Sequence, residues 1–193
     1  LLARFGSVSF PHPGGCVIGQ RPIDLFLDGF AALGARIHSD LSGKYPVYQI
    51  DGKRLRGAEY FFRTISVTGT EAMMMTASRI RGRTILRNAA TEPEIPLLAE
   101  FLNRCGARIR GAGTHTIEID GVSYLRGGSY TVMPDRIDAG SFAILAAATR
   151  SPLTITNIIP EHIGSVLHAL RSMGVETKVG KRSVAITPPK RLI

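Results

Sequence analysis

Hydrophobic residues recur at helical spacing in three segments of the chain, and each segment is preceded by proline and followed by glycine. The prolines are Pro22, Pro93 and Pro160, and the glycines are Gly34, Gly106 and Gly174. Proline suits the first position of a helix because its missing N–H costs no hydrogen bond there. Glycine readily takes the left-handed conformation that ends a helix. The apolar positions are Ile23, Phe26, Leu27, Phe30 and Leu33, then Ile95, Leu98, Phe101 and Leu102, then Ile163, Val166, Leu167 and Leu170. This pattern predicts helices over residues 22–33, 93–105 and 161–173.

Two further segments, Glu71–Ala77 and Ser141–Thr149, are apolar nearly all round. A helix of this kind is typical of a core position that is buried on every side. The methionine triplet of the first segment fits core filling better than a soft binding surface. Each segment is followed by a β-rich stretch, Thr84–Leu86 and Leu153–Thr156, and further short strands are predicted at Thr116–Ile119 and Ser183–Ile186.

The chain also repeats itself. Leu33–Ile37 returns as Cys105–Ile109, a shift of 106 − 34 = 72 residues, and more loosely as Met173–Thr177, a shift of 174 − 106 = 68 residues. Shorter matches join Ile50-Asp51-Gly52 to Ile119-Asp120-Gly121 and Leu55-Arg56-Gly57 to Leu125-Arg126-Gly127. A repeat that mixes helix and sheet favours compact domains built from a few copies over a solenoid.

Composition and charge limit the classes of ligand and partner that the chain is expected to bind. The net charge of +9 favours anionic ligands, but the densest basic cluster, Arg79, Arg81, Arg83 and Arg87, has no interleaved aromatic residues. We therefore expect phosphorylated small molecules and no nucleic acid. No apolar run is long enough to cross a membrane, so no membrane partner is expected. Two cysteines and five scattered histidines indicate neither a disulfide framework nor a zinc site, and favour a reducing, cytoplasmic setting.

One loop carries candidate chemistry. Cys16 follows the flexible pair Gly14-Gly15, and Arg21 stands five residues later at the predicted start of a helix. A cation and a helix N-terminus both lower the pKa of a nearby thiol, and the thiolate is the reactive form. Cys105 belongs instead to an apolar helix face, where we expect a buried and inert thiol.

Four motifs occur in an order and spacing that resemble the UDP-N-acetylglucosamine 1-carboxyvinyltransferases, a family of enolpyruvyl transferases. They are Pro13–Leu25, Glu92–Ile95, Gly111–Thr114 and Pro134–Ile137. The resemblance implies an α/β (α+β) fold of βαβαββ units arranged as an inside-out α/β barrel, of which this chain is an incomplete part. It further implies that residues 1–133 hold the second and third units of one domain, and that residues 134–193 hold the first unit of the other.

The resemblance also implies a reaction. The enolpyruvyl group of phosphoenolpyruvate would pass to the 3-hydroxyl of UDP-N-acetylglucosamine with release of phosphate, the first committed step of peptidoglycan synthesis, without cofactor or metal. Cys16 matches the loop cysteine that donates a proton and is the target of fosfomycin, and Arg21 matches the arginine that meets the anionic donor. The segments matching those that line the sugar nucleotide comprise Arg21, Pro22, Ile23, Asp24, Leu25, Thr64, Ile65, Ser66 and Val67. Thr64 departs from the Lys of many members, and Arg63 stands beside it.

Charged positions near the interdomain cleft are matched by Glu92, Glu94, Asp135 and Arg136. Each site residue also has an ordinary structural interpretation, such as a helix-start charge for Asp24 or a surface ion pair for Asp135 and Arg136. Two other functions stay open: a non-catalytic repeat or binding module of the same fold, and the shikimate-pathway enolpyruvyl transferase. The Gly-Gly-Cys loop argues against the latter, which uses no loop cysteine.

Overall fold

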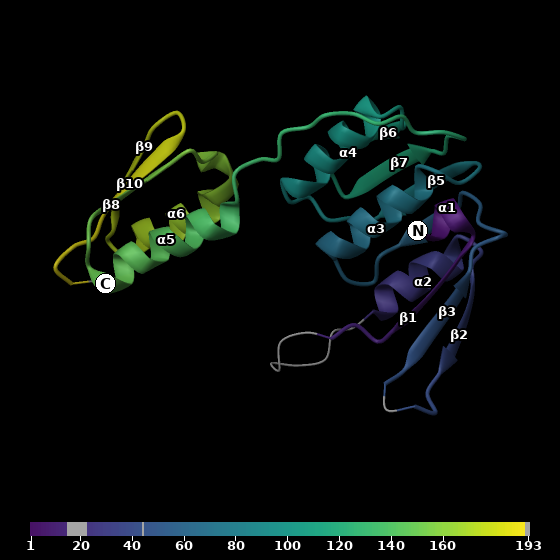
Figure 1. The fold of residues 1–193 in the computed structure, drawn as a ribbon. Helices are drawn as coiled ribbons and strands as arrows, with labels where there is room; N and C mark the ends of the chain where they lie inside the picture. The colour runs from purple at the N-terminus through teal and green to yellow at the C-terminus, as the bar shows by residue number, and fades with distance from the viewer. Residues whose placement is uncertain (15–22, 44, 192–193) are drawn as a thin grey trace. The chain divides into compact units, whose positions relative to one another are not determined.

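A computed structural model describes residues 1–14, 23–43 and 45–191 (Figure 1). The chain divides into two compact units, Leu1–Tyr130 and Thr131–Ile193. The sequence analysis placed a division between residues 133 and 134. The assignment of these units to particular repeats of two domains stays a prediction.

Unit 1 contains four helices and seven strands among its described residues. Its elements are α1 (Leu2–Phe5), β1 (Ser7–Pro11), α2 (Asp24–Ala32), β2 (Arg36–Asp40), β3 (Val47–Asp51), β4 (Glu59–Phe61), α3 (Val67–Ala77), β5 (Arg83–Arg87), α4 (Glu94–Arg104), β6 (Ile109–Arg110) and β7 (Thr116–Asp120). Unit 2 is smaller. Its elements are α5 (Arg136–Thr149), β8 (Leu153–Thr156), the 3₁₀ helix η1 (Pro160–Ile163), α6 (Gly164–Ser172), β9 (Glu176–Val179) and β10 (Ser183–Thr187).

The same antiparallel arrangement of three strands occurs three times. The sheet orders are β1-β3-β2, β5-β7-β6 and β8-β10-β9, with β4 added in parallel beside β5. In each case one helix, α2, α4 or α6, follows the first strand in the order given. The next two strands form a hairpin, and the second strand of that hairpin pairs with the first strand. The shared topology confirms the repeat that the sequence predicts.

The three repeated helices end in the same way. Gly34, Gly106 and Gly174 have φ angles of 94°, 103° and 84°. The residue after each glycine donates its N–H to a carbonyl in the last turn, at Phe30, Leu102 and Leu170, over 2.9, 2.9 and 3.0 Å. This is the predicted left-handed stop, which satisfies carbonyls that a helix end leaves free.

The first residues of the three helices differ from those predicted from the sequence. α2 and α4 begin at Asp24 and Glu94, and Pro22 lies outside the described residues. The third helix was predicted as one element from residue 161, but its first turn is the 3₁₀ helix Pro160–Ile163. Periodicity alone does not separate the two helix types over a single turn, because residues i and i+3 share a face in both.

Helix α3 forms the centre of the unit 1 core. It packs against α1, α2 and α4, and the side chains of Met73 and Met74 are fully buried. Met75 is 49% exposed, so only two of the three methionines fill the core. Cys105 is 5% exposed in the same unit, as expected from its place on an apolar helix face.

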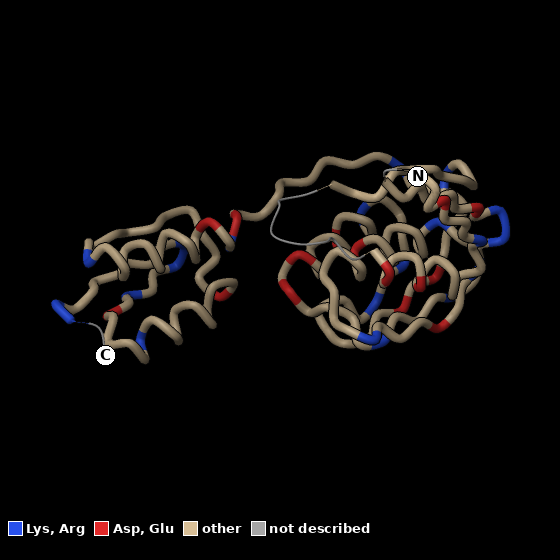
Figure 2. Tube along the Cα trace, turned by 90° about the horizontal axis from the view of Figure 1, so that it is seen from below, with Lys and Arg blue, Asp and Glu red and all other residues tan. Residues whose placement is uncertain are grey.

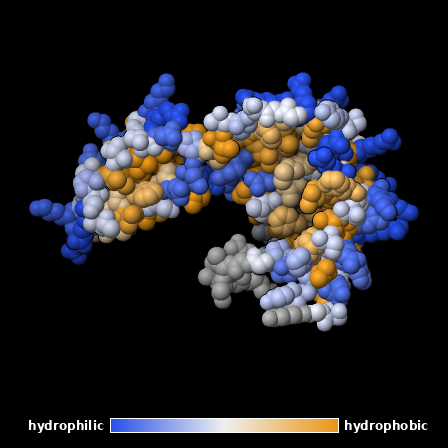
Figure 3. Space-filling view, in the orientation of Figure 1, coloured by the Kyte–Doolittle hydropathy of each residue, from blue (hydrophilic) through white to orange (hydrophobic). Residues whose placement is uncertain are grey.

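Helix α5 contradicts the prediction of burial on every side. Its alanines Ala139, Ala143 and Ala146 are buried, but Phe142 and Ile144 are 52% and 53% exposed. Within unit 2 the helix packs against β8, β10, η1 and α6, which cover one of its faces. Apolar residues are correspondingly visible on the surface of the unit (Figure 3).

Basic and acidic residues are interspersed over both units (Figure 2). On the four-stranded sheet β4-β5-β7-β6 of unit 1, arginines are paired with carboxylates. Arg83 and Arg110 each donate to Asp120 over 2.9 Å, and the two guanidinium groups lower the pKa of that carboxyl to about 2. No helix within the described ranges is both long and apolar enough to cross a membrane.

Candidate functional site

The parallel strands β4 and β5 end side by side at Phe61 and Arg87. The loop 62–66 then leads from β4 into α3, and the loop 88–93 leads from β5 into α4. The carboxyl ends of parallel strands are a preferred place for ligand sites in α/β folds. Of the predicted residues, Thr64 to Ser66 and Glu92 lie on these two connections, and Val67 and Glu94 are the first residues of the helices that follow.

The loop after β4 ends in a capped helix. The hydroxyl oxygen of Ser66 accepts the backbone N–H of Gly69 over 3.1 Å, which makes Ser66 the N-cap of α3. Thr64 and Ile65 are exposed just before this cap, and Ser66 and Val67 are half-buried. Backbone N–H groups and the helix dipole favour anions at such a terminus.

The first two turns of α2 contact β4 and the loop that follows it. Arg63 forms an ion pair with Asp24 and lies 3.9 Å, measured from Nε to Oδ2, from Asp28. The hydroxyl of Tyr60, on β4, donates to the carbonyl of Leu25 over 3.2 Å. Burial, and to a lesser degree the charge of Asp28, raises the pKa of Tyr60. These contacts connect Asp24 and Leu25 to Tyr60 and Arg63, and Arg63 directly precedes Thr64. The resemblance assigns residues on both sides of this connection, Ile23 to Leu25 and Thr64 to Val67, to a sugar nucleotide.

The loop after β5 carries the predicted carboxylates. Glu94 lies in the first turn of α4, and Glu92 accepts the N–H of Thr91 over 3.0 Å. Burial and, secondly, the charge of Glu94 raise the pKa of Glu71 on the neighbouring helix α3. Two carboxylates of adjacent helices thus repel each other beside these loops.

Asp28 and Glu71 are not among the residues predicted from the sequence, and Arg63 is predicted only as a neighbour of Thr64. One signal was present: Asp24 and Asp28 are four residues apart, so they share a helix face and together favour a cation beside it. Glu71 gave no comparable signal, because its position opposite Glu94 depends on how α3 packs against α4.

The remaining predicted residues fall into two sets. Cys16, Arg21 and Pro22 lie outside the described residues. Asp135 and Arg136 belong to unit 2, where Asp135 is the N-cap of α5. One carboxylate oxygen of Asp135 accepts the N–H groups of Ile137 and Asp138 over 2.7 and 3.2 Å.

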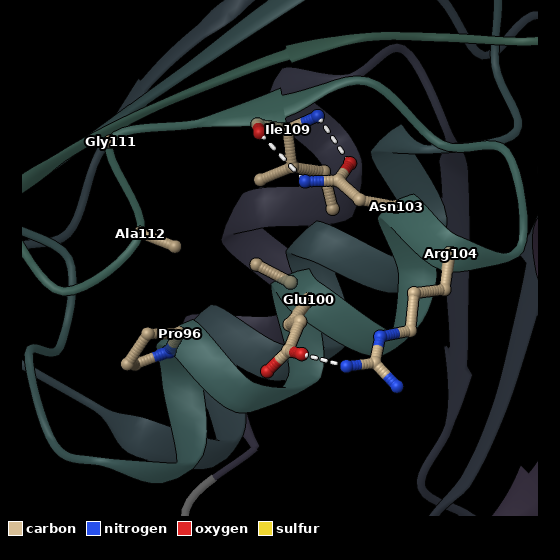
Figure 4. Close-up of a pocket in the computed structure, with 8 residues that line it drawn as sticks. Pro96, Glu100, Asn103, Arg104, Ile109, Gly111 and Ala112 are labelled. Atoms are coloured by element: carbon tan, nitrogen blue, oxygen red, sulfur yellow. Dashed lines mark hydrogen bonds and ion pairs between the residues drawn. The ribbon is translucent and has the colours of Figure 1, made fainter. Parts of the chain in front are cut away.

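An open pocket of about 550 Å³ lies between α4 and the β6–β7 connection (Figure 4). Asn103 exchanges two hydrogen bonds with the backbone of Ile109 at its wall, and Glu100 pairs with Arg104 (Figure 4). Gly111 and Gly113 take φ angles of 77° and 91° in the turn beside it. The motif Gly111–Thr114 therefore has a structural role as a tight turn, and the pocket walls contain none of the predicted site residues among those described.

Comparison with known sequences decides the family. The sequence model described as EPSP synthase (3-phosphoshikimate 1-carboxyvinyltransferase) matches residues 1–193. The chain belongs to the EPSP synthase family. Within the described part of this family member, no three His, Cys, Asp or Glu side chains come together as potential metal ligands.

Curated relatives refine this position within the EPSP synthase family. The UDP-N-acetylglucosamine 1-carboxyvinyltransferase of Coxiella burnetii strain Dugway is 48% identical over 184 residues, which is 95% of this chain and 42% of that protein. A second UDP-N-acetylglucosamine 1-carboxyvinyltransferase, from Prochlorococcus marinus, is 48% identical over 194 residues, 100% of this chain and 45% of that protein. The chain thus spans less than half the length of these relatives.

Solved structures of the EPSP synthase family show the same fold. The enolpyruvyl transferase NikO of Streptomyces tendae matches with a TM-score of 0.80 at 21% identity, covering 100% of this chain and 46% of that one. An EPSP synthase of Acinetobacter baumannii matches with a TM-score of 0.63 at 20% identity, covering 93% of this chain and 42% of that one. The predicted enolpyruvyl transferase fold, present here as an incomplete part, is confirmed.

Proposed function

We propose that the chain is part of an enzyme that transfers the enolpyruvyl group of phosphoenolpyruvate to the 3-hydroxyl of UDP-N-acetylglucosamine, releasing phosphate in the first committed step of peptidoglycan synthesis. The observation that carries the proposal is the 48% identity, over nearly the whole chain, to proteins named for this reaction. The shikimate-pathway alternative has weaker support, because the solved EPSP synthase is only 20% identical.

The loop 13–22 supplies the reacting groups in this proposal. Cys16 donates a proton to the enolpyruvyl group, and the guanidinium of Arg21 binds the anionic donor. A fixed guanidinium suits phosphate and carboxylate because it offers several donors in a planar fork. The same cation makes the Cys16 thiol a stronger acid, which favours proton donation. The thiolate left after proton loss is the target of an electrophilic epoxide such as fosfomycin.

The sugar nucleotide binds, in the same proposal, between the start of α2 and the start of α3. Pro22, Ile23, Asp24 and Leu25 form one wall and Thr64 to Val67 form the other. The ion pair of Arg63 with Asp24 supports this arrangement, since it joins the first wall to the residue that directly precedes the second. The N-terminus of α3, capped by Ser66, offers a favourable position for a phosphate of the nucleotide.

Charged side chains complete the site. Following the resemblance, we assign Glu92, Glu94, Asp135 and Arg136 to charged positions near the substrates, where they help to exclude water from a reactive intermediate. Both substrates are small, soluble anions, which agrees with the net charge of +9 and with a cytoplasmic location.

Calorimetric titration tests the substrate class. The purified chain is titrated with UDP-N-acetylglucosamine and, separately, with shikimate 3-phosphate, and Asp24→Asn is the variant that weakens the proposed nucleotide wall. We expect binding of UDP-N-acetylglucosamine, weaker binding by the variant, and no binding of shikimate 3-phosphate. Binding of shikimate 3-phosphate alone would replace the proposal with the alternative, and binding of neither ligand would contradict it.

Catalytic turnover by the chain is tested separately from ligand binding. The family's reacting site lies between two domains, and this chain spans 42–45% of its curated relatives. Catalysis needs every group held close to its productive geometry. We therefore expect no steady phosphate release from phosphoenolpyruvate and UDP-N-acetylglucosamine by the 193-residue chain. Sustained release above the rate without protein would contradict this expectation.

A further inference from the structure

We propose that Thr70 and Asn88 are positioning residues, which fix the loop before α3 to the loop before α4 and so hold the sugar-nucleotide wall in its binding conformation. The inference rests on the proposed function, because it assigns these two residues to the proposed UDP-N-acetylglucosamine site. Neither residue was among the site residues predicted from the sequence.

Thr70 is fully buried and hydrogen-bonded in two directions. Its hydroxyl donates to the carbonyl of Ser66, the N-cap of α3, over 2.8 Å. The same hydroxyl oxygen accepts the N–H of Ala90, in the loop after β5, over 3.1 Å. One buried side chain therefore joins the end of the first loop to the middle of the second.

Asn88 makes the complementary connection from the second loop. Its side-chain amide donates to the carbonyl of Phe62 over 2.8 Å, at the beginning of the first loop. The backbone supports this contact, since the N–H of Phe62 donates to the carbonyl of Arg87 over 3.0 Å. Asn88 has a φ of 54°, a left-handed conformation in which asparagine is enriched. The segment 62–66 is thus held at both ends, by Asn88 at Phe62 and by Thr70 at Ser66.

This arrangement has a consequence for ligand affinity. Ile65 is 46% exposed between the two fixed ends, and Thr64 beside it is also exposed, so little packing of their own holds these residues in place. We call the hydrogen bonds of Thr70 and Asn88 to the segment 62–66 the clamp. If one of these bonds is removed, the loop samples other conformations, and the observed affinity falls in proportion to the share of molecules whose loop can still bind. Thr70 is fully buried, so it acts on the ligand through the loop and not by direct contact.

Matched variants separate the effect of the clamp on ligand affinity from its effect on the stability of the whole fold. Thr70→Val keeps the shape of the side chain and removes the hydroxyl, whereas Thr70→Ser keeps the hydroxyl. Asn88→Gly keeps the left-handed backbone accessible and removes the amide. The control is Asn103→Ala, which removes the two hydrogen bonds, of 2.9 and 2.8 Å, between Asn103 and Ile109 at the other end of α4. Each variant is titrated with UDP-N-acetylglucosamine, and its melting temperature is measured.

Thr70→Val removes two hydrogen bonds and Asn88→Gly removes one. We expect each variant to weaken affinity about tenfold or more. Thr70→Ser should bind within about twofold of the wild type, because its hydroxyl can make the same bonds. Asn103→Ala should melt at a lower temperature and bind as the wild type does.

Three results would overturn the inference while leaving the proposed function intact. They are unchanged affinity in Thr70→Val, equal losses in Thr70→Ser and Thr70→Val, and an equal loss in Asn103→Ala. Failure of the wild-type chain to bind UDP-N-acetylglucosamine would instead overturn the proposed function, and this inference with it.

Discussion

The guanidinium of Arg63, on the loop after β4, forms an ion pair with the carboxylate of Asp24 in the first turn of α2. The two residues are far apart in the sequence. Their contact joins Asp24, in one segment assigned to the sugar nucleotide, to Arg63, which directly precedes the other. The side chains are 59% and 50% exposed, so water and salt screen the pair strongly.

Replacement of Arg63 by Gln should therefore separate affinity from stability. We expect the free energy of unfolding to change by less than about 1 kcal/mol, as is usual for an exposed ion pair. Affinity for UDP-N-acetylglucosamine should fall about threefold or more, since Asp24 loses the cation that orients it. Urea denaturation and calorimetric titration measure the two quantities. The control is Arg104→Gln, which breaks the exposed pair with Glu100 on α4. A large loss of stability in Arg63→Gln, or an affinity loss equal to that of the control, would contradict this role.

Gly57 and Gly127 look equivalent in the repeated sequence, but their surroundings differ. The residues before them make the same hydrogen bond, Arg56 to the carbonyl of Leu33 and Arg126 to that of Cys105, both over 2.9 Å. A Cβ atom on Gly57 would lie 2.3 Å from the carbonyl oxygen of Arg83, whereas a Cβ atom on Gly127 would meet no atom within 4 Å. Strand β4 follows Gly57 and brings it against β5.

Alanine substitution at these positions tests the packing. Gly57→Ala should cost about 3 kcal/mol or more, because the contact is with rigid backbone and the strand must move. Gly127→Ala should stay within about 0.5 kcal/mol of the wild type. Equilibrium unfolding in urea gives both values, and similar losses in the two variants would show that β4 does not pack as described.

Glu71 should reduce stability at neutral pH. Burial and the neighbouring Glu94 raise its pKa, so the folded state binds the proton more tightly than the unfolded state does. Protonation therefore favours folding, and this advantage is lost as the pH rises through the raised pKa. Glu71→Gln should melt at a higher temperature than the wild type at pH 7. The difference should vanish below the ordinary glutamate pKa of about 4.3. A lower melting temperature at pH 7, or a gain independent of pH, would contradict this account.

The sequence predicted the repeated elements well because their signals are local. Helical spacing and glycine stops determine α2, α4 and α6, and the observed φ angles of Gly34, Gly106 and Gly174 confirm the stops. The prediction that Phe142 and Ile144 are buried was wrong. An apolar sequence shows which faces of a helix could be buried, but it does not show which elements pack against them. Thr70, Asn88 and Glu71 were missed for a related reason. Their roles depend on contacts between two loops and two helices, and no spacing in the sequence encodes these contacts.

The reactivity of the two cysteines tests the account most directly. The chain is treated with limiting iodoacetamide at neutral pH, with and without UDP-N-acetylglucosamine, and the labelled peptides are identified by mass spectrometry. Cys105 is 5% exposed, so the reagent has little access to its sulfur. Cys16 follows two glycines and precedes Arg21, so we expect it to react first, and we expect the sugar nucleotide to change its rate. Equal labelling of both cysteines, faster labelling of Cys105, or a Cys16 rate unaffected by the sugar nucleotide would contradict the assignment of Cys16 to a UDP-N-acetylglucosamine enolpyruvyl transferase site.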